Sequence, residues 1–254
     1  MKSLLKRILA RFGYRISHAT PTGTPESADA LFDLTESERE IVRTAQPITM
    51  TGPVRLATLV QAVTHIVKNG IPGDIAECGV WRGGSMVAIA RTLLSLGDTS
   101  RRLFLYDTFE GMTEPTVRDQ DFAGHSAAAQ LDRDAPRTGV WAFASFEDVR
   151  ANLLATGYPI DRIVFVPGRV EVTIPATLPG ALALLRLDTD WYESTRHELV
   201  HLYPLLSQLG LLIIDDYGHW QGAREATDEF VKTLDHPLYL HRIDYPARIA
   251  VKIS

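Results

Sequence analysis

Two apolar stretches of the chain each end in a pair of acidic residues: ALALLRLDTD, residues 181–190, and GLLIIDDYGH, residues 210–219. Apolar runs of this length are typical of strands buried inside a parallel sheet. In open α/β sheets, ligands bind in the crevice beyond the carboxyl ends of the strands. The two acidic pairs therefore predict a functional site at one edge of such a sheet, formed by Asp188, Asp190, Asp215 and Asp216.

Four carboxylates in one place need a compensating charge. Crowded carboxylates raise one another's pKa unless a cation or a shared proton offsets the repulsion, and oxygen ligands suit a hard cation. We therefore expect bound Mg²⁺. The alternative is that each acid caps a helix that follows its strand, which aspartate does well. Because Asp215 and Asp216 are adjacent, at least one must turn toward the crevice, and this favours the metal.

Apolar strands alternate with amphipathic helices from residue 74 to the end. The expected helices cover residues 85–97, 145–157, 192–210 and 222–235, and the expected strands cover residues 74–79, 102–107, 161–168, 181–188, 211–216, 238–244 and 248–254. Such alternation predicts an α/β fold, a doubly wound sheet with helices on both faces. The short link YPA predicts a hairpin between the last two strands. We expect seven strands, mostly parallel, with the last one antiparallel.

A helical extension precedes this pattern, and we place the domain boundary between residues 1–46 and 47–254. Residues 1–16 are basic and carry apolar side chains on one helical face. Such a helix could lie on a membrane surface as a peripheral contact, or pack on its own domain or on a partner subunit. A linker follows, and then a helix in which Thr35 and Glu38 have capping-box spacing. A second helix is expected to begin at Pro53.

The composition narrows the class of protein. The 254 residues are 45% hydrophobic and 22% charged, which suits one domain with a large core. A net charge of -5 argues against a nucleic-acid partner. The single cysteine, Cys78, excludes an intrachain disulfide and fits a reducing compartment. No apolar stretch is long enough to span a bilayer, so there is no transmembrane segment and we expect a cytoplasmic protein.

A long connection follows the second strand. Residues 108–139 contain no convincing strand, and a connection of this length inside a domain is usually functional or disordered. It starts at the carboxyl end of a strand, which places it over the crevice. We expect it to be a lid.

A glycine-rich turn follows the first strand, in ECGVWRGGS, residues 77–85. Glycines at such a turn let the backbone pass close to a flat or anionic cofactor, although a purely structural tight turn is the alternative. The spacing is not G-x-G-x-x-G, which disfavours a dinucleotide. The next strand ends in Asp107, an acid suited to ribose hydroxyls. Together these features indicate a nucleoside-containing cofactor without a diphosphate, and S-adenosylmethionine (SAM) satisfies that description.

Four blocks of the sequence, in order, resemble the macrocin O-methyltransferase family. They are PGDIAECGVWRGGS, LYDTFEGM, LDTDWYEST and IIDDYGHWQGAREATDEF, and the resemblance covers residues 47 to 254. Enzymes of this family methylate sugar hydroxyls on antibiotics and related glycosides. The resemblance implies a class I SAM-dependent methyltransferase fold, Mg²⁺ dependence, and a substrate hydroxyl held by the metal. It also raises the expectation of a homo-oligomer.

The resemblance also implies roles for individual residues. Asp188, Asp215 and Asp216 would be the metal ligands, and Asp190 the general base. His219, three residues beyond the metal pair, is a second catalytic candidate as an alternative base or a substrate hydrogen-bond partner, unless it is an ordinary loop histidine. The expected cofactor residues are Glu77, Gly79, Arg82, Gly83, Ser85, Asp107 and Thr108.

The sequence leaves three alternative functions open. The first is an enzyme that methylates a sugar hydroxyl of a natural-product glycoside or saccharide, with SAM and Mg²⁺ as cofactors. The second keeps the cofactor and the metal but methylates a catechol or other phenol, which is more acidic and needs less help from a base. The third is a SAM-binding subunit without catalysis. Binding SAM alone requires none of the acids after the fourth and fifth strands, so their presence favours an enzyme.

Overall fold

The computed structural model describes residues 31–133 and 139–253. The expected basic segment and the linker therefore lie outside the described residues. Residues from Asp33 onward form one compact unit. Among the described residues, no helix combines the length and apolar character that crossing a membrane requires.

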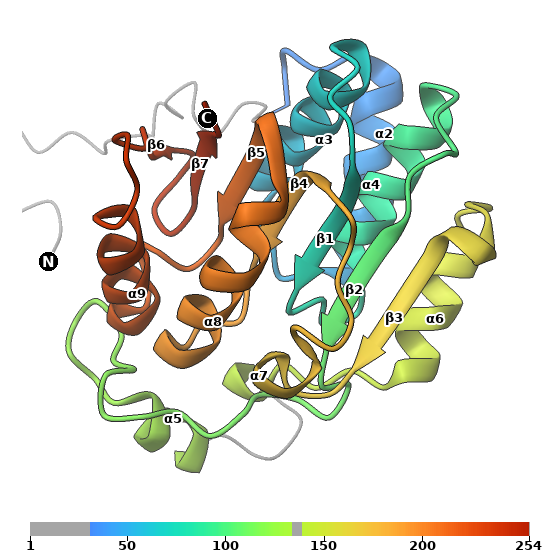
Figure 1. The fold of residues 1–254 in the computed structure, drawn as a ribbon. Helices are drawn as coiled ribbons and strands as arrows, with labels where there is room; N and C mark the ends of the chain where they lie inside the picture. The colour runs from blue at the N-terminus through green and yellow to red at the C-terminus, as the bar shows by residue number, and fades with distance from the viewer. Residues whose placement is uncertain (1–30, 134–138, 254) are drawn as a thin grey trace, which may run out of the picture. The chain divides into compact units, whose positions relative to one another are not determined.

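A seven-stranded sheet forms the centre of the described unit, in the order β3-β2-β1-β4-β5-β7-β6 (Figure 1). Strands β1 to β5 pair in parallel, whereas β7 is antiparallel to both β5 and β6. The mostly parallel sheet with an antiparallel last strand is confirmed. The strands are β1 (Asp74–Cys78), β2 (Leu103–Asp107), β3 (Ile163–Pro167), β4 (Leu182–Leu187), β5 (Leu206–Ile214), β6 (His241–Arg242) and β7 (Arg248–Val251).

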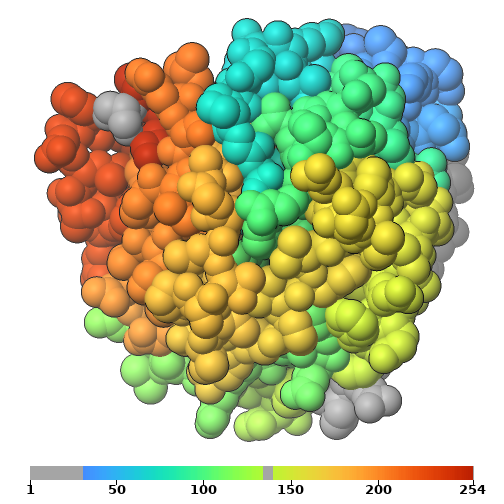
Figure 2. Space-filling model, turned by 45° about the vertical axis from the view of Figure 1, so that its right-hand side comes forward, coloured from blue at the N-terminus to red at the C-terminus, as the bar shows by residue number. Residues whose placement is uncertain are grey.

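Helices cover both faces of the sheet because successive strand residues point to opposite sides. Ile75 belongs to a core with α3 (Pro53–Lys68), α4 (Gly84–Ser95) and α6 (Phe146–Leu154). Its neighbour Ala76 belongs to the opposite core, with α7 (Val170–Thr173) and α8 (Tyr192–Leu202). Helix α9 (Gln221–Val231) packs beside α8. In Figure 2, yellow to gold residues around β3 and α7 form the front surface and hide most of the sheet.

Helix α2 (Glu36–Ala45) begins at the predicted capping box. The Thr35 hydroxyl accepts a hydrogen bond from the Glu38 amide at 3.3 Å, and the Glu38 carboxylate accepts one from the Thr35 amide at 2.8 Å. The helix packs on α3 and α4. The domain boundary that we expected at residue 46 therefore falls inside the compact unit, next to the short helix η2 (Gln46–Ile48).

The helix expected over residues 192–210 is wrong in its second half. Helix α8 ends at Leu202, a 3₁₀ turn η5 (Tyr203–Leu205) follows, and β5 begins at Leu206. Pro204 lacks an amide hydrogen and cannot continue an α-helix. The residues after it instead extend β5 alongside β4, with Leu206 paired to Leu182.

The segment expected to be a lid is fastened to the ends of two helices. Asp119 accepts a hydrogen bond from the Tyr192 amide at 2.8 Å, and the Trp191 indole donates to the Thr113 carbonyl at 3.0 Å. Helix α5 (Ala127–Arg133) packs on Trp191 and Trp220. Figure 1 shows α5 beyond the arrowheads of the strands, so the segment lies at the carboxyl edge of the sheet. Further 3₁₀ turns among the described residues are η3 (Gly139–Trp141) and η4 (Ile160–Arg162).

Candidate functional site

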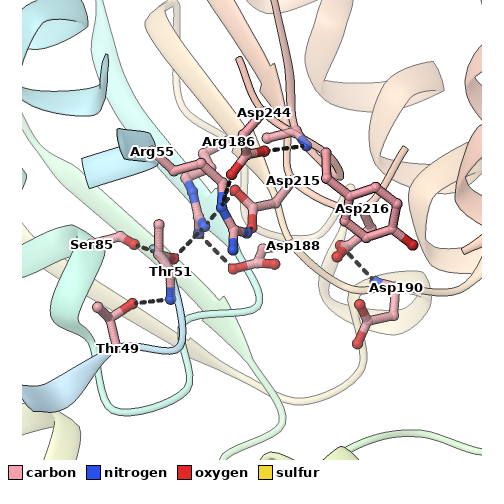
Figure 3. A network of polar contacts seen from close by, with 12 residues as sticks. Thr49, Thr51, Arg55, Ser85, Arg186, Asp188, Asp190, Asp215, Asp216 and Asp244 are labelled. Atoms are coloured by element: carbon pink, nitrogen blue, oxygen red, sulfur yellow. Dashed lines mark hydrogen bonds and ion pairs between the residues drawn. The ribbon is translucent and has the colours of Figure 1, made fainter. Parts of the chain in front are cut away.

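Asp188 and Asp215 leave neighbouring strands side by side. The last residues of β4 and β5, Leu187 and Ile214, are register partners. The Asp188 amide donates to the Cys78 carbonyl and the Asp215 amide to the Leu187 carbonyl, both at 2.9 Å, so each acid is fixed to the strand beside it. One carboxylate oxygen from each of Asp188, Asp215 and Asp216 lies within 4.8 Å of the others, and Figure 3 shows these carboxylates gathered together.

Asp190 lies against the same cluster. Its backbone has the left-handed φ of 66°, and its amide donates to Oδ2 of Asp216 at 3.2 Å. Burial raises the pKa of Asp190 to about 6. Burial, and then the neighbouring Asp190 carboxylate, raise the pKa of Asp216 well above its usual range. Both shifts express the cost of collecting negative charge away from water.

A buried arginine in β4 offsets part of this charge. Arg186 is 2% exposed, and its Nη1 contacts Glu77 and lies 2.7 Å from Asp188. Its Nη2 lies 2.9 Å from Asp215 and donates to the Thr51 hydroxyl at 2.9 Å. The two ends of one planar guanidinium therefore hold three acids from three strand ends, which suits the fixed donor geometry of arginine.

A second arginine reaches the cluster from helix α3. Arg55 contacts Asp215, and its Nε lies 3.1 Å from Asp244, which follows β6. Figure 3 shows Arg55 and Arg186 on the same side of Asp215. The acid cluster is thus connected to α3 and to the turn that leads into β7.

Most of the predicted site residues line one large cleft. A smaller cavity adjoins it and shares Gly79, Asp107 and Asp188. Thr108 lines the smaller cavity, together with Gly168 and Val170 after β3. The predicted residues that line the larger cleft are Glu77, Gly79, Ser85, Asp107, Asp188, Asp190, Asp215, Asp216 and His219.

The glycine turn after β1 is a close approach of two backbones. Gly79 has a φ of 78°, and a Cβ added to it would overlap the carbonyl oxygen of Asp188. Only glycine fits there without displacing the end of β4. The turn therefore lies directly against the acid cluster.

Asp107 organises the same turn. Its Oδ2 accepts hydrogen bonds from the Val80 and Trp81 amides at 2.7 and 3.1 Å, and its Oδ1 accepts one from the Phe109 amide at 2.7 Å. Burial raises its pKa, which these three donors oppose. Carboxylate oxygens together offer about four acceptor sites, so capacity for a ligand hydroxyl remains.

Glu77 is the deepest acid in the cleft. Arg186 pairs with its Oε1, while its Oε2 is buried without a hydrogen-bond partner in the described part of the chain. Burial raises the pKa of Glu77 to about 7, and Arg186 opposes the shift. An unpartnered buried acceptor that lines a cleft indicates a ligand with a hydrogen-bond donor.

Two predicted cofactor residues line neither cavity. Arg82 pairs with Asp148 of α6 at 2.8 Å. Gly83 has a φ of 81° at the start of α4, and a Cβ added to it would come within 2.9 Å of Leu153. In this structure both residues connect the glycine turn to α6.

His219 stands among aromatic rings at the edge of the cleft. Its Nδ1 lies 3.1 Å from the Tyr245 hydroxyl, and its ring meets Trp220 edge-on at 4.8 Å between centroids. Its amide donates to the Asp216 carbonyl at 3.0 Å. Burial lowers its pKa, which favours a neutral ring.

Cys78 ends β1 beneath α8 and is fully buried. Burial, and then the nearby Glu198 carboxyl, raise the pKa of the thiol well above its usual range. A buried neutral thiol is a poor nucleophile, so Cys78 acts as a packing residue.

Arg55, Arg186, Thr51 and Asp244 were not predicted from the sequence. A signal for Arg186 was available, because an arginine inside a buried strand must find acids, and Asp188 stands two residues later. No comparable signal marked Arg55 or Asp244, because the topology alone brings α3 and the β6–β7 turn to the strand ends.

Comparison with known proteins supplies the family. A family model described as macrocin-O-methyltransferase (TylF) matches residues 19–249. The 8-demethyl-8-(2,3-dimethoxy-alpha-L-rhamnosyl)-tetracenomycin-C 4'-O-methyltransferase of Streptomyces olivaceus is 42% identical over 182 residues, 72% of this chain and 67% of that protein. Mycinamicin III 3''-O-methyltransferase of Micromonospora griseorubida is 34% identical over 229 residues, 89% of this chain and 86% of that protein.

Solved structures agree with these relatives. The O-methyltransferase NovP superposes with a TM-score of 0.71 at 31% sequence identity, covering 82% of this chain and 83% of its own. The calicheamicin methyltransferase CalS11 has a TM-score of 0.56 at 21% identity, covering 90% of this chain and 93% of its own, which supports the fold alone. The chain therefore belongs to the macrocin O-methyltransferase family, and it is an O-methyltransferase.

Proposed function

We propose that this enzyme transfers a methyl group from SAM to a sugar hydroxyl of a natural-product glycoside, with Mg²⁺ bound at the acid cluster. One observation carries the proposal. Three carboxylates within 4.8 Å of one another share a cleft with the glycine turn after β1 and with the acid at the end of β2. A cation site and a nucleoside site would thereby lie next to each other.

The donor set fits Mg²⁺. Asp188, Asp215 and Asp216 offer only carboxylate oxygens, which hard cations prefer. The buried Oδ1 of Asp215 lies 2.9 Å from Arg186 and forms an ion pair with it. The two groups are not aligned for a hydrogen bond, and this oxygen accepts none from the described residues. The cleft lining contains more acidic residues than the two arginines can neutralise. A divalent cation would offset the remaining negative charge.

The neighbouring cavity fits the adenosine part of SAM. Its lining joins the turn after β1 to the ends of β2 and β3, the place where a nucleoside would meet Tyr106, Asp107 and Gly168. Asp107 at its edge can accept hydrogen bonds from ribose hydroxyls, and Gly168 leaves room for a flat base after β3. The unpartnered Oε2 of Glu77 is suited to an ammonium group. These features support SAM, with Gly79 between the two cavities.

Asp190 is the proposed general base. It adjoins Asp216 and lines the cleft, so its carboxylate can accept the proton of a hydroxyl held next to the cation site. When bound, a divalent cation stabilises negative charge on a coordinated hydroxyl oxygen and lowers the pKa of that hydroxyl. A sugar hydroxyl needs this help because it ionises only at very high pH.

Relatives support a glycoside as the acceptor. One is named for a rhamnosyl-tetracenomycin, one for demethyldecarbamoylnovobiocin and one for mycinamicin III. We propose the same class of acceptor here, with antibiotic biosynthesis as the setting and the cytoplasm as the location. We also propose that residues 108–139 act as a lid over the cleft, that residues 47–254 carry the catalytic function, and that the enzyme works as a homo-oligomer.

Metal removal tests the cation. Purified enzyme is expected to lose methyl transfer to its glycoside acceptor in EDTA and to regain it when Mg²⁺ is added in excess. Calorimetry should then detect Mg²⁺ binding to wild type and much weaker binding to Asp215→Asn. Full activity in metal-free enzyme would contradict the proposed role of Mg²⁺.

Replacing the base tests the proton transfer. Asp190→Asn is expected to lower kcat by about 10²- to 10⁴-fold, the usual contribution of a general base, while SAM affinity stays close to wild type. Asp161→Asn is the matched control, because that acid is 77% exposed and far from the cleft lining. A kcat for Asp190→Asn within a few-fold of wild type would show that another group accepts the proton. If the acceptor is a phenol, Asp190→Asn should lower kcat only mildly, because a phenol is more acidic and needs less help from a base.

A further inference from the structure

Three aromatic rings from separate segments meet at the edge of the cleft. Phe122 comes from the 108–133 segment, His219 from the loop between β5 and α9, and Tyr245 from the turn between β6 and β7. The Phe122 centroid lies 5.8 Å from that of His219 and 5.4 Å from that of Tyr245, and the last two lie 5.9 Å apart. We refer to these three residues as the aromatic wall.

The aromatic wall begins next to the acid cluster. The amides of His219 and Trp220 both donate to the Asp216 carbonyl at 3.0 Å, so the wall starts one turn after that acid. His219, Trp220 and Tyr245 line the same cleft as Asp216. A molecule that fills this cleft up to the acids can therefore contact His219 and Tyr245, and Phe122 adjoins both of these rings.

The rings of the wall are more exposed than the neighbouring Trp220. Trp220 is 5% exposed and packs in a small core with Trp191, whereas Tyr245 is 43% and Phe122 61% exposed. Phe122 belongs to none of the hydrophobic cores of the described residues. Large apolar rings that gather at the mouth of a cleft, instead of packing inside, are characteristic of ligand contacts.

The charges around the wall disfavour a phosphorylated acceptor. The two arginines of the described cleft lining, Arg55 and Arg186, are both held by acids. Arg224 lies nearby on α9, but its Nε and Nη2 donate to the Tyr217 and Gly218 carbonyls. A neutral, apolar group meets less resistance here than a diphosphate.

We propose that the aromatic wall binds the aglycone of the acceptor, stacking on an aromatic or otherwise flat apolar group while the sugar reaches the acid cluster. This inference rests on the proposed function. It makes Phe122 and Tyr245 specificity-determining residues, and it gives His219 a binding role beside Tyr245 instead of the role of base. It also means that a glycosyl transfer must precede this methylation.

Paired acceptors test the wall. Methyl and 4-nitrophenyl glycosides of the same 6-deoxyhexoses present one sugar with and without an aromatic aglycone. Phe122→Ala is expected to raise KM for the aryl glycosides by roughly tenfold, which corresponds to about 1.4 kcal/mol of lost stacking and contact area. For the methyl glycosides KM should change less than about twofold, and kcat and the Kd values for Mg²⁺ and SAM should stay at wild-type levels.

Matched variants separate stacking from other effects. Val117→Ala removes an apolar side chain that is 90% exposed on the same segment, and it should leave both KM values unchanged. Tyr245→Phe keeps the ring and removes the hydroxyl that contacts His219, so it should retain most of the preference for the aryl glycoside, whereas Tyr245→Ala should lose it.

Equal KM changes for aryl and methyl glycosides in Phe122→Ala would overturn the inference, as would better turnover of a nucleoside-diphosphate 6-deoxyhexose than of the aryl glycoside. The inference and the proposed function fail in different ways. If wild type methylates no glycoside, the proposed function fails, and calorimetric binding of the 4-nitrophenyl glycosides to wild type and Phe122→Ala still decides the wall. Equal affinity, or no binding to either protein, would count against it.

Discussion

Arg186 holds three acids that would otherwise repel one another across three strand ends. Its guanidinium is buried, and it contacts Glu77, Asp188 and Asp215. Removing one partner from a buried ionic network is costly because the remaining charges are left without compensation. The acids named from the sequence are thus only half of the electrostatic arrangement.

Arg186→Met is expected to lower the free energy of unfolding by about 3–5 kcal/mol, since it keeps side-chain volume and removes the charge. The control is Arg43→Met, because Arg43 is 54% exposed in its ion pair with Glu36 and such surface pairs contribute about 0–1 kcal/mol. Urea unfolding of the metal-free proteins measures both. Similar losses for the two variants would contradict the view that Arg186 is needed by the cluster.

The sequence predicted the acids better than their partners. Asp188 and Asp215 could be named because apolar runs end at them, and a strand end is a place that periodicity can locate. Arg55 could not, because it lies in an amphipathic helix where an arginine ordinarily faces water. Arg82 shows the opposite case, since a position beside a glycine turn does not tell which way a long side chain points, and this one pairs with Asp148.

Among the elements, the 108–133 segment departs most from what its sequence suggested. It has little regular structure, yet Asp119 is fully buried and accepts hydrogen bonds from the Thr116 amide and hydroxyl as well as from the Tyr192 amide. Asp119 thereby caps α8 from outside the helix. A segment that opens over the cleft would have to break or bend around this attachment.

Asp119→Asn is expected to loosen the segment. Three donors now bind the two carboxylate oxygens of Asp119, whereas an asparagine side chain has only one acceptor oxygen. Limited proteolysis should then cut within residues 108–133 several-fold faster than in wild type, while the free energy of unfolding falls only by the roughly 1 kcal/mol typical of a lost cap. Asp132→Asn, an exposed acid on α5, provides the control. Unchanged cleavage in Asp119→Asn would show that the packing of α5 alone fastens the segment.

The predicted elements were correct where local signals were strong. The capping box at Thr35 and Pro53 at the start of α3 both mark helix starts that the structure has. The end of α8 was missed because apolar residues continue past Leu202 with a spacing that suits a helix or a strand. Pairing with β4, a contact distant in sequence, decides that the residues from Leu206 are extended.

For the whole molecule, alternation of strands and helices indicated a doubly wound sheet, but not the order of its strands. The order follows from the reversal between β1 and β4, where the chain crosses from one half of the sheet to the other. Such a switch point opens a crevice at the carboxyl ends. The family resemblance, and not periodicity, supplied the expectation of this arrangement.

Residues from Asp33 onward form a compact unit of their own. If the basic segment lies on a membrane surface or on a partner subunit and not on this unit, an enzyme that lacks residues 1–30 is expected to keep its melting temperature to within about 2 °C, corresponding to less than roughly 1 kcal/mol, and to bind Mg²⁺ as the full chain does. Scanning calorimetry measures the first and titration calorimetry the second. A large drop in melting temperature would show that the removed residues contribute to the fold.

The same truncation separates the two interpretations of the basic segment. Loss of binding to anionic vesicles with an unchanged sedimentation coefficient would favour a membrane-surface helix. A smaller assembly in sedimentation, with no vesicle binding by either protein, would favour packing on a partner subunit.

Cys78 gives the experimenter a practical advantage. The only thiol of the chain is sealed beneath α8, so maleimide dyes should leave the native protein unmodified. A cysteine introduced at Phe122 would then be the single labelling position, and a fluorophore there could follow arrival of the acceptor at the mouth of the cleft in real time. The rate at which Cys78 itself reacts would then measure how often the native sheet opens.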